Sequence, residues 1–243
     1  MNSNALYLFH LPIIALFIVS GSALSGDKNA SNPYSTEVFK LTSSDIRSYH
    51  PGNAVNYTSI IAGSGVAITG QLKQSINNTV TNPSGKKCLE HTLSATYAGV
   101  GGPTPLTIRL LYHQDKQNSL YECGYYDNKT SSYVFISDTA NTPGGIALSI
   151  QSPMKIGNTT TNLIAYSNST WKDCTRSVQS IENVETAIGT FEAYKIAETC
   201  SSNADSSYTS AESWFVPSLY TIKESGVGEI IAGDFVINHF DFD

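Results

Sequence analysis

The strongest constraint on the fold is a two-residue alternation of apolar and polar side chains that recurs along the chain. In residues 66–76 the sequence VAITGQLKQSI places its valine, isoleucine and leucine side chains on one face and alanine, threonine, lysine and serine on the other. The pattern returns in residues 89–97 and 106–112. Successive side chains of a strand point to opposite faces, so these segments are typical of half-buried antiparallel strands. The predicted class is all-β, an antiparallel sandwich or (half-)barrel.

Further strands are predicted where β-branched and aromatic residues alternate between turn-forming residues. They cover residues 54–61, 119–126, 132–137, 145–151, 170–184, 190–199, 207–216, 219–223 and 228–242. Residues 99–105 are rich in glycine and proline, and we expect them to form the loop between two of the alternating segments. No segment shows the apolar stripe of an amphipathic helix.

The first residues have the layout of a secretory signal peptide. An apolar run extends from Leu6 to Val19 and small residues follow it. The run is shorter than the ~20 residues that cross a bilayer. Ser22 stands where a lipoprotein carries its lipidated cysteine, which leaves no thiol to acylate. We predict a cleaved signal peptide over residues 1–25, a retained anchor being the alternative.

The predicted mature chain has a flexible leader over residues 26–35 and a single β-rich domain over residues 36–243, without a transmembrane span. The protein is therefore expected to be exported, either to the periplasm or as a secreted protein. Its formal net charge of −6 and the lack of any Lys/Arg-rich run argue against a nucleic-acid partner, because phosphate binding needs clustered cations.

All four cysteines lie in the predicted mature part, and an even number in an exported chain indicates two disulfides. Residues 170–184 and 190–199 form a predicted hairpin. A loop of about four or five residues over Thr186 to Gly189 places Cys174 opposite Cys200 or one residue away, and a bulge can absorb that difference. We therefore predict a Cys174–Cys200 disulfide, and by elimination a Cys88–Cys123 disulfide.

One short sequence occurs twice. Gly52-Asn53 opens one predicted strand, and Gly157-Asn158 opens a segment in the second half of the chain. This echo raises the possibility that the domain consists of two related halves.

A resemblance to a known family extends patchily over residues 45–225 and is strongest over residues 178–225. The segments VETAIGTFEAYKIAET and ESWFVPSLYTIKESG resemble the bacterial domain-of-unknown-function 3108-like group of exported proteins and lipoproteins. The principal matching positions are Gly189, Phe191, Lys195, Trp214, Pro217 and Lys223. The resemblance implies a β-rich envelope domain with a concave apolar face, like that of lipoprotein carriers, and no known enzymatic activity.

Candidates for nucleophilic catalysis are weak. The chain lacks the Gly-x-Ser-x-Gly elbow of serine hydrolases. Ser84/Lys87 and Ser152/Lys155 match the Ser-x-x-Lys spacing, but both pairs lie in Pro- or Gly-bearing segments rather than on a helix, which the chemistry requires. His91 lies between leucines on an apolar strand face, where a core histidine is the usual interpretation. A hydrolase that uses His91 or His113 as its base with a loop serine is the rival hypothesis.

Binding sites for metals or sugars have similarly weak signals. His239, Asp241 and Asp243 would share one face of the last strand and could bind a divalent cation, but a solvated polar face over a buried aromatic one explains them without a function and is favoured. Tyrosines between Tyr121 and Tyr133 could stack on sugars, yet such residues are commonly amphipathic sheet residues. We predict no metal, cofactor or catalytic residue.

The sequence favours a non-enzymatic exported envelope protein that binds an apolar small molecule or an envelope protein on a concave sheet face. The alternatives are a secreted serine hydrolase with an irregular site and a purely structural surface protein.

Overall fold

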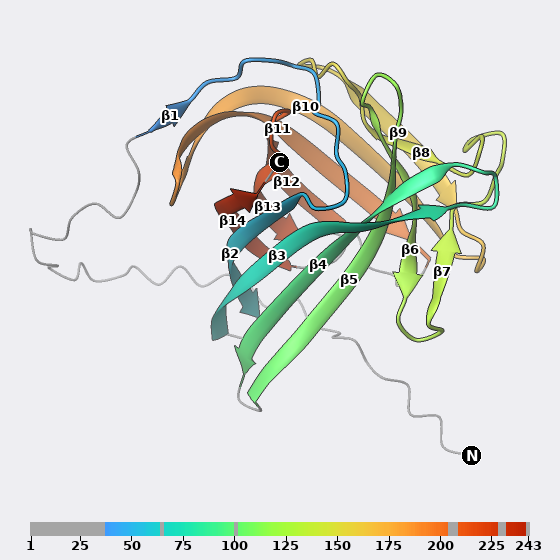
Figure 1. The fold of residues 1–243 in the computed structure, drawn as a ribbon, viewed down its shortest axis with the longest axis horizontal. Helices are drawn as coiled ribbons and strands as arrows, with labels where there is room; N and C mark the ends of the chain where they lie inside the picture. Colours follow the sequence, from blue (N-terminus) through green and yellow to red (C-terminus); the bar gives the residue numbers. More distant parts are fainter. Residues whose placement is uncertain (1–36, 64–65, 100–101, 204–208, 228–231, 242–243) are drawn as a thin grey trace, which may run out of the picture.

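The computed structural model describes residues 37–63, 66–99, 102–203, 209–227 and 232–241, and within these ranges the chain forms strands and no helix (Figure 1). The strands are β1 (Val38–Phe39), β2 (Ala54–Gly63), β3 (Val66–Thr81), β4 (Lys87–Gly99), β5 (Gly102–Gln114), β6 (Leu120–Asp127), β7 (Ser132–Phe135), β8 (Ala147–Ile150), β9 (Thr159–Ala165), β10 (Trp171–Thr186), β11 (Gly189–Ser202), β12 (Thr209–Phe215), β13 (Thr221–Val227) and β14 (Ala232–Asp241). The predicted all-β class is confirmed. The predicted signal peptide and leader, residues 1–35, lie outside the described residues.

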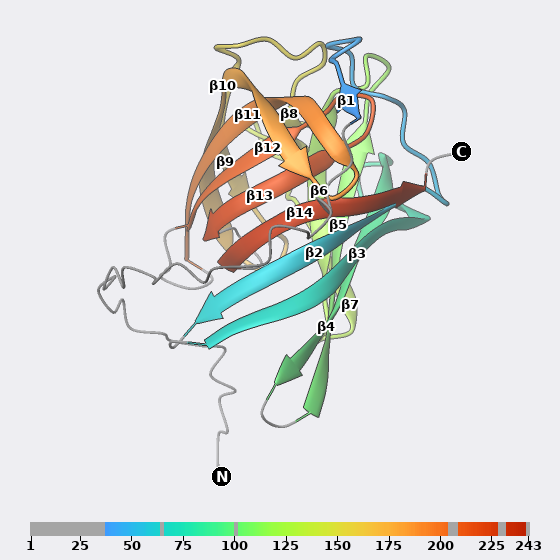
Figure 2. The same ribbon diagram turned by 90° about the vertical axis from the view of Figure 1, so that its left-hand side faces the viewer.

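One strongly curved sheet contains these strands. Its order is β7-β6-β5-β4-β3-β2-β14-β13-β12-β11-β10-β9, with antiparallel neighbours throughout this path, while β8 pairs with β6 and β1 pairs in parallel with β11. Figure 2 shows the part of this order from β10 to β3 following the curve of the sheet. The sheet folds over, so that β2–β5 and β10–β14 form two crossing layers (Figure 1). The architecture is thus an open half-barrel whose halves pack as a sandwich.

The two edges of the sheet meet at one point. Ile136, just after β7, forms an antiparallel bridge with Tyr166, just after β9. The Ser137 N–H donates to the Ala165 carbonyl oxygen at 2.8 Å, and the Ser167 N–H donates to the Phe135 carbonyl oxygen at 2.9 Å. This contact holds the concave side of the sheet partly enclosed.

Two apolar clusters fill much of the space between the layers. The first includes Val55, Phe191 and Ile222, and the second includes Ile46, Met154 and Phe215. Side chains of this kind each contribute about 1.5–3 kcal/mol when fully buried. No helix within the described ranges is long and apolar enough to cross a membrane.

The structure corrects the sequence analysis at two places. Residues 102–105, predicted as part of a loop, belong to β5, and Gly102 at the start of β5 pairs with Gly99 at the end of β4. Proline has no N–H to donate to a neighbouring strand. Pro103 and Pro105 fit within β5 because they lie in the part of β5 that does not pair with β6, which pairs only with Leu110–Gln114. The sequence analysis also missed β1 and β9, because β1 is very short and threonine and asparagine dominate the start of β9.

The hairpin of β10 and β11 has a register that changes once. Near the turn Thr186 lies opposite Gly189, and a bulge between Val178 and Ser180 then shifts the pairing by one residue. Beyond the bulge Cys174 lies directly opposite Cys200, and the two form a disulfide. This is the pair that the sequence analysis predicts, and the bulge supplies the one-residue correction.

The second disulfide joins Cys88 on β4 to Cys123 on β6, with β5 between these strands in the sheet. Their Cα atoms are 6.5 Å apart. The register of β5 and β6 shifts between Leu111 and Tyr112, and such a bulge bends a strand locally. Both cysteines are fully buried with Leu111 in a separate small cluster.

The first Gly-Asn sequence makes a defined set of backbone hydrogen bonds before β2. The Gly52 N–H donates to the Ile76 carbonyl oxygen and the Ile76 N–H donates to the Asn53 carbonyl oxygen, each at 2.9 Å. Gly52 has a φ of 107°, which favours glycine, and β3 has a bulge immediately after Ile76.

The second Gly-Asn sequence repeats this arrangement before β9. The Gly157 N–H donates to the Val178 carbonyl oxygen at 2.8 Å, and the Val178 N–H donates to the Asn158 carbonyl oxygen at 2.9 Å. Gly157 has a φ of 90°, and the bulge of β10 follows Val178. The two sites therefore share their backbone geometry, although the relation between the two halves of the chain stays a prediction.

We expect Gly189→Ala to lower the free energy of unfolding by roughly 2 kcal/mol or more, because strain and a clash act together. Gly189 has a φ of 142°, and a Cβ there would lie 2.8 Å from the Glu37 carbonyl oxygen and 2.7 Å from the Phe39 ring. Gly85→Ala is the matched control, since its φ of 82° is also positive but a Cβ would meet no atom within 4 Å. Urea unfolding should show a clearly smaller loss for Gly85→Ala, and equal losses would refute the clash.

Candidate functional site

A pocket of about 190 Å³ lies between the two layers of the sheet. Its apolar lining consists of Leu72, Leu93, Leu110, Leu120, Ile150, Ile196, Ala211 and Phe215. Its polar lining consists of Tyr57, Gln74, Tyr112, Ser149, Arg176, Glu198, Ser213, Tyr220, Thr221 and Glu224. The pocket is therefore amphipathic: somewhat more of its wall is apolar than polar, and its many polar side chains can orient a bound molecule.

The two-residue period of the strands explains which side chains reach the pocket. On β3 the inward residues are Leu72 and Gln74, and on β12 they are Ala211, Ser213 and Phe215. Residues between them point to the opposite face of the sheet. Contributions come from both layers, so the pocket depends on the folding-over of the sheet rather than on any single hairpin.

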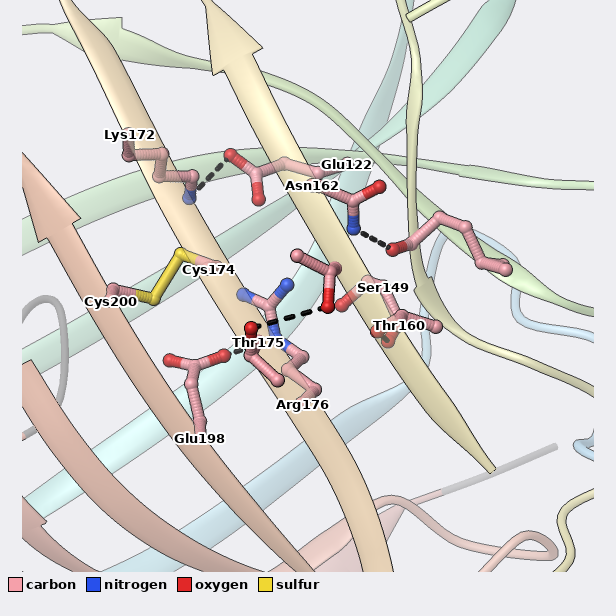
Figure 3. Close-up of a disulfide and its surroundings, with 12 residues drawn as sticks. Glu122, Ser149, Thr160, Asn162, Lys172, Cys174, Thr175, Arg176, Glu198 and Cys200 are labelled. Carbon is pink, nitrogen blue, oxygen red and sulfur yellow. Dashed lines mark hydrogen bonds and ion pairs between the residues drawn. A yellow bond between two sulfur atoms is a disulfide. The ribbon is translucent and has the colours of Figure 1, made fainter. Parts of the chain in front are cut away.

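One wall of the pocket carries opposite charges. Arg176 on β10 and Glu198 on β11 are cross-strand partners, and the Arg176 Nε and Glu198 Oε2 atoms form an ion pair (Figure 3). The Cys174–Cys200 disulfide lies beside this pair on the same two strands (Figure 3). A covalent link two residues away fixes the register that places Arg176 opposite Glu198.

A second ion pair, more buried than the first, lies next to this wall. The Lys172 Nζ atom is 2.7 Å from the Glu122 Oε1 atom, and their side chains are only 4% and 8% exposed. The Tyr166 hydroxyl donates to the same oxygen at 2.6 Å. Burial raises the pKa of Glu122, but the positive charges of Lys172 and Arg176 outweigh burial and hold that pKa below its ordinary value.

Two tyrosines of the pocket, Tyr57 and Tyr220, remain neutral. Burial raises the pKa of Tyr57, and the neighbouring Tyr220 and Glu224 raise it further. Burial also raises the pKa of Tyr220, to about 12, against a lowering by a hydrogen bond from Gln74 and with a further increase from Glu224. Neutral hydroxyl groups can donate or accept hydrogen bonds to an uncharged ligand, so these tyrosines suit polar groups of a small amphipathic molecule.

His91 adjoins the pocket and is 1% exposed. Its Nδ1 atom lies 3.3 Å from the Gln74 Nε2 atom and 3.4 Å from the Tyr220 hydroxyl. Burial lowers the pKa of His91 to about 3, so the imidazole is neutral at physiological pH. The structure thus places His91 in the core, surrounded by aromatic rings, as the sequence analysis expected for a histidine on an apolar face.

The other candidates for serine hydrolysis each have a different hydrogen-bond partner. The His113 Nδ1 atom is 2.8 Å from the Lys87 carbonyl oxygen. The Ser84 hydroxyl donates to Asp138 at 3.0 Å, and the Ser152 hydroxyl oxygen accepts from the Ile46 N–H at 3.2 Å. The serines of both Ser-x-x-Lys segments therefore form hydrogen bonds to groups other than a histidine.

Within the described residues, no group of three or more His, Cys, Asp and Glu side chains could hold a metal ion. The backbone of His239 and Asp241 belongs to β14. Asp243 lies outside the described residues, so the metal hypothesis for this row stays a prediction. The tyrosines of β6 and β7 pack within the sheet, with Tyr126 against Tyr133 and under the Arg109 guanidinium.

The positions that carry the family resemblance support the sheet rather than line the pocket. Phe191 stacks on Phe39 with ring centroids 4.4 Å apart. The Trp214 Nε1 atom donates to Glu182 at 2.8 Å, and the Lys223 Nζ atom lies 4.5 Å from the Trp214 ring centroid. Lys195 forms an ion pair with Glu212 at 2.8 Å.

The remaining two of these positions shape turns. The Pro217 carbonyl oxygen accepts from the Arg47 N–H at 2.9 Å, and Gly189 starts β11 with a positive φ. The positive φ explains a glycine at position 189, whereas the Pro217 contact uses a backbone carbonyl that any residue could supply.

Comparisons with known proteins give limited similarity. No family model and no curated protein matches the sequence, so the resemblance to the domain-of-unknown-function 3108-like group stays a prediction. A solved structure from Bacteroides fragilis, described as an exported protein with a YmcC-like fold, has 12% identity and a TM-score of 0.40, covering 79% of this chain and 97% of that chain. A structure from Parabacteroides distasonis, described as a lipoprotein, has 13% identity and a TM-score of 0.39, covering 84% of this chain and 97% of that chain. These values are too low to assign the chain to the family of either protein.

The sequence analysis did not identify the pocket residues. Arg176, Glu198 and Glu224 lie on different strands, and no motif links them in the sequence. The available signal for a pocket residue was a polar side chain on the apolar, inward-facing side of an alternating strand. Gln74 in the segment QLKQSI, on the same face as Leu72 and Ile76, is such a residue.

Proposed function

We propose that the protein is a non-enzymatic, exported binding protein that holds a small, mainly apolar molecule between the layers of its folded sheet. The observation that carries this proposal is the pocket of about 190 Å³, whose wall combines apolar and polar side chains from both layers. Two buried disulfides and the signal-like start of the sequence support export to an oxidising compartment.

The size and lining of the pocket define the ligand class. Pockets for drug-sized ligands commonly measure roughly 300–1,000 Å³, so this pocket suits a smaller molecule or one short apolar segment of a larger molecule. The ion-paired Arg176 and Glu198 and the neutral Tyr57 and Tyr220 favour hydrogen bonding over net charge. A neutral molecule with an aliphatic or aromatic body and one hydroxyl or carbonyl end fits these properties.

We expect Ala211→Phe to reduce binding of a neutral naphthylamine fluorescence probe by at least about tenfold. Ala211 is buried and lines the pocket, so a phenyl ring there would occupy the ligand space. Ser210→Phe is the matched control, because Ser210 precedes it on β12 and is exposed. Equal probe affinity in both variants and the wild type would contradict the pocket as the binding site.

A serine hydrolase is the competing function, which His91 and His113 would have to support. A fluorophosphonate probe tests it directly: labelling of one serine, abolished by His113→Ala or His91→Ala, would establish a hydrolase. We expect the folded protein to remain unlabelled, because His91 is buried and His113 faces the Lys87 carbonyl oxygen.

A further inference from the structure

A second, very small space adjoins the larger pocket. It has a volume of about 10 Å³ and is lined by Tyr49, Asn53, Ala54, Val55, Gln74, Ile76, His91 and Tyr220. Gln74 and Tyr220 also line the larger pocket, so the two spaces share a wall. A volume of this size corresponds to about one water-sized group.

Two of the side chains that line this space each carry a buried nitrogen atom without a hydrogen-bond partner. The two atoms are Asn53 Nδ2 and His91 Nε2, and each residue is 1% exposed. A buried polar atom that lacks a partner costs about 1–3 kcal/mol, so two of them on side chains that line one space require an explanation.

The hydrogen bond made by the second polar atom of each side chain, Asn53 Oδ1 and His91 Nδ1, indicates that both unpartnered nitrogen atoms carry a hydrogen to donate. The Asn53 Oδ1 atom accepts from the His50 N–H at 3.2 Å, which directs the amide nitrogen away from that contact. The Gln74 Nε2 atom faces the His91 Nδ1 atom at 3.3 Å, so Nδ1 accepts and the proton of the neutral ring lies on Nε2.

The second Gly-Asn site offers a comparison within the same molecule. Asn158 occupies the backbone position that corresponds to Asn53, yet it is partly exposed, and its Nδ2 atom lies 3.5 Å from the Pro153 carbonyl oxygen. The buried, unpartnered amide is therefore a property of the Asn53 site and not of the shared backbone geometry.

We propose that the space beside His91 is a binding site for one acceptor oxygen, which receives hydrogen bonds from Asn53 Nδ2 and His91 Nε2. In the empty protein that oxygen belongs to a water molecule. When the larger pocket is filled, the hydroxyl or carbonyl oxygen of the ligand takes its place, and this second source rests on the proposed binding function. The site would then read the polar end of the ligand while the larger pocket holds its body.

A high-resolution crystal structure of the protein freed of ligand by refolding tests the site itself. We expect one oxygen within hydrogen-bond distance of both nitrogen atoms. A well-ordered but empty space, or a His91 ring turned to another partner, would overturn the proposal. A structure of protein taken directly from its own compartment distinguishes the sources, because an isolated water and an oxygen continuous with ligand density both support the site, and only the latter supports ligand recognition.

Asn53→Asp gives an independent solution test by NMR titration of His91. The aspartate would keep an oxygen for the His50 N–H and place a negative charge where the amide nitrogen stood. The pKa of His91 should then rise from about 3 by roughly 1 to 3 pH units. Asn158→Asp, the matched control, should leave the pKa of His91 unchanged. An equal pKa of His91 in Asn53→Asp and the wild type would show that Asn53 and His91 do not share one site.

Discussion

Lys172→Met should lower the free energy of unfolding by about 3–5 kcal/mol. This is the largest loss that we expect from the removal of one charged side chain in this protein. The methionine keeps most of the side-chain volume but leaves the Glu122 carboxylate buried without its nearest cation. The double variant Lys172→Met/Glu122→Gln should recover much of the loss, because glutamine is neutral and can still accept from the Tyr166 hydroxyl. Urea unfolding measures both.

An exposed pair provides the control for this prediction. Lys40 and Glu192 are also 2.7 Å apart, but the Lys40 side chain is 64% exposed, so Lys40→Met should cost less than about 1 kcal/mol. Similar losses for Lys40→Met and Lys172→Met would contradict the burial argument.

The effect of Lys172→Met should depend on pH. In the wild type the pKa of Glu122 is lowered on folding, so its contribution is present above the unfolded pKa and is lost as pH falls through the folded pKa. Without Lys172, burial dominates and raises that pKa, so the protonated acid becomes the favoured folded form. The difference in stability between wild type and variant should therefore be largest near neutral pH and shrink on acidification. A difference that grows on acidification would be inconsistent with these charges.

Cys174→Ala/Cys200→Ala should lower the free energy of unfolding by about 3–4 kcal/mol, because the disulfide closes a long segment of the unfolded chain. The sequence separation is 26 residues for this pair and 35 for Cys88 and Cys123, so removal of either should have a similar effect. A loss below about 0.5 kcal/mol would show that the disulfide does not constrain the unfolded protein.

Tryptic mapping without reductant tests the pairing itself. Cleavage at lysine and arginine isolates the four cysteines in the fragments 88–109, 117–129, 173–176 and 196–223. Fragment 173–176 should be linked to 196–223, and 88–109 to 117–129. Any other linkage would contradict the register of the β10–β11 hairpin.

Local patterns accounted for the strands and for the close approach of β10 and β11. Alternation predicted β3, and the turn before Gly189 limited Cys174 to two positions relative to Cys200. The sequence could not show that a bulge after Val178 selects one of them, since a bulge depends on packing within the folded sheet. The glycines and prolines of residues 99–105 indicated a loop, but Gly99 belongs to β4, and Pro103 and Pro105 lie in the part of β5 that does not pair with β6.

The pocket was less predictable than the strands. Ala211 and Leu72 lie far apart in the sequence and meet only because the sheet folds over, and no local pattern encodes that curvature. His91 was recognisable as a core histidine from its apolar neighbours. Its relation to Asn53 was not recognisable, because the two residues come from separate segments that β3 brings together.

Native mass spectrometry of protein purified from its own compartment, followed by solvent extraction and identification of released molecules, tests the central claim most directly. We predict a stoichiometric complex with a small, neutral, mainly apolar molecule in the wild type, and its absence in Ala211→Phe but not in Ser210→Phe. Folded wild-type protein that is free of any such molecule, and that also fails to bind the naphthylamine probe, would contradict the account.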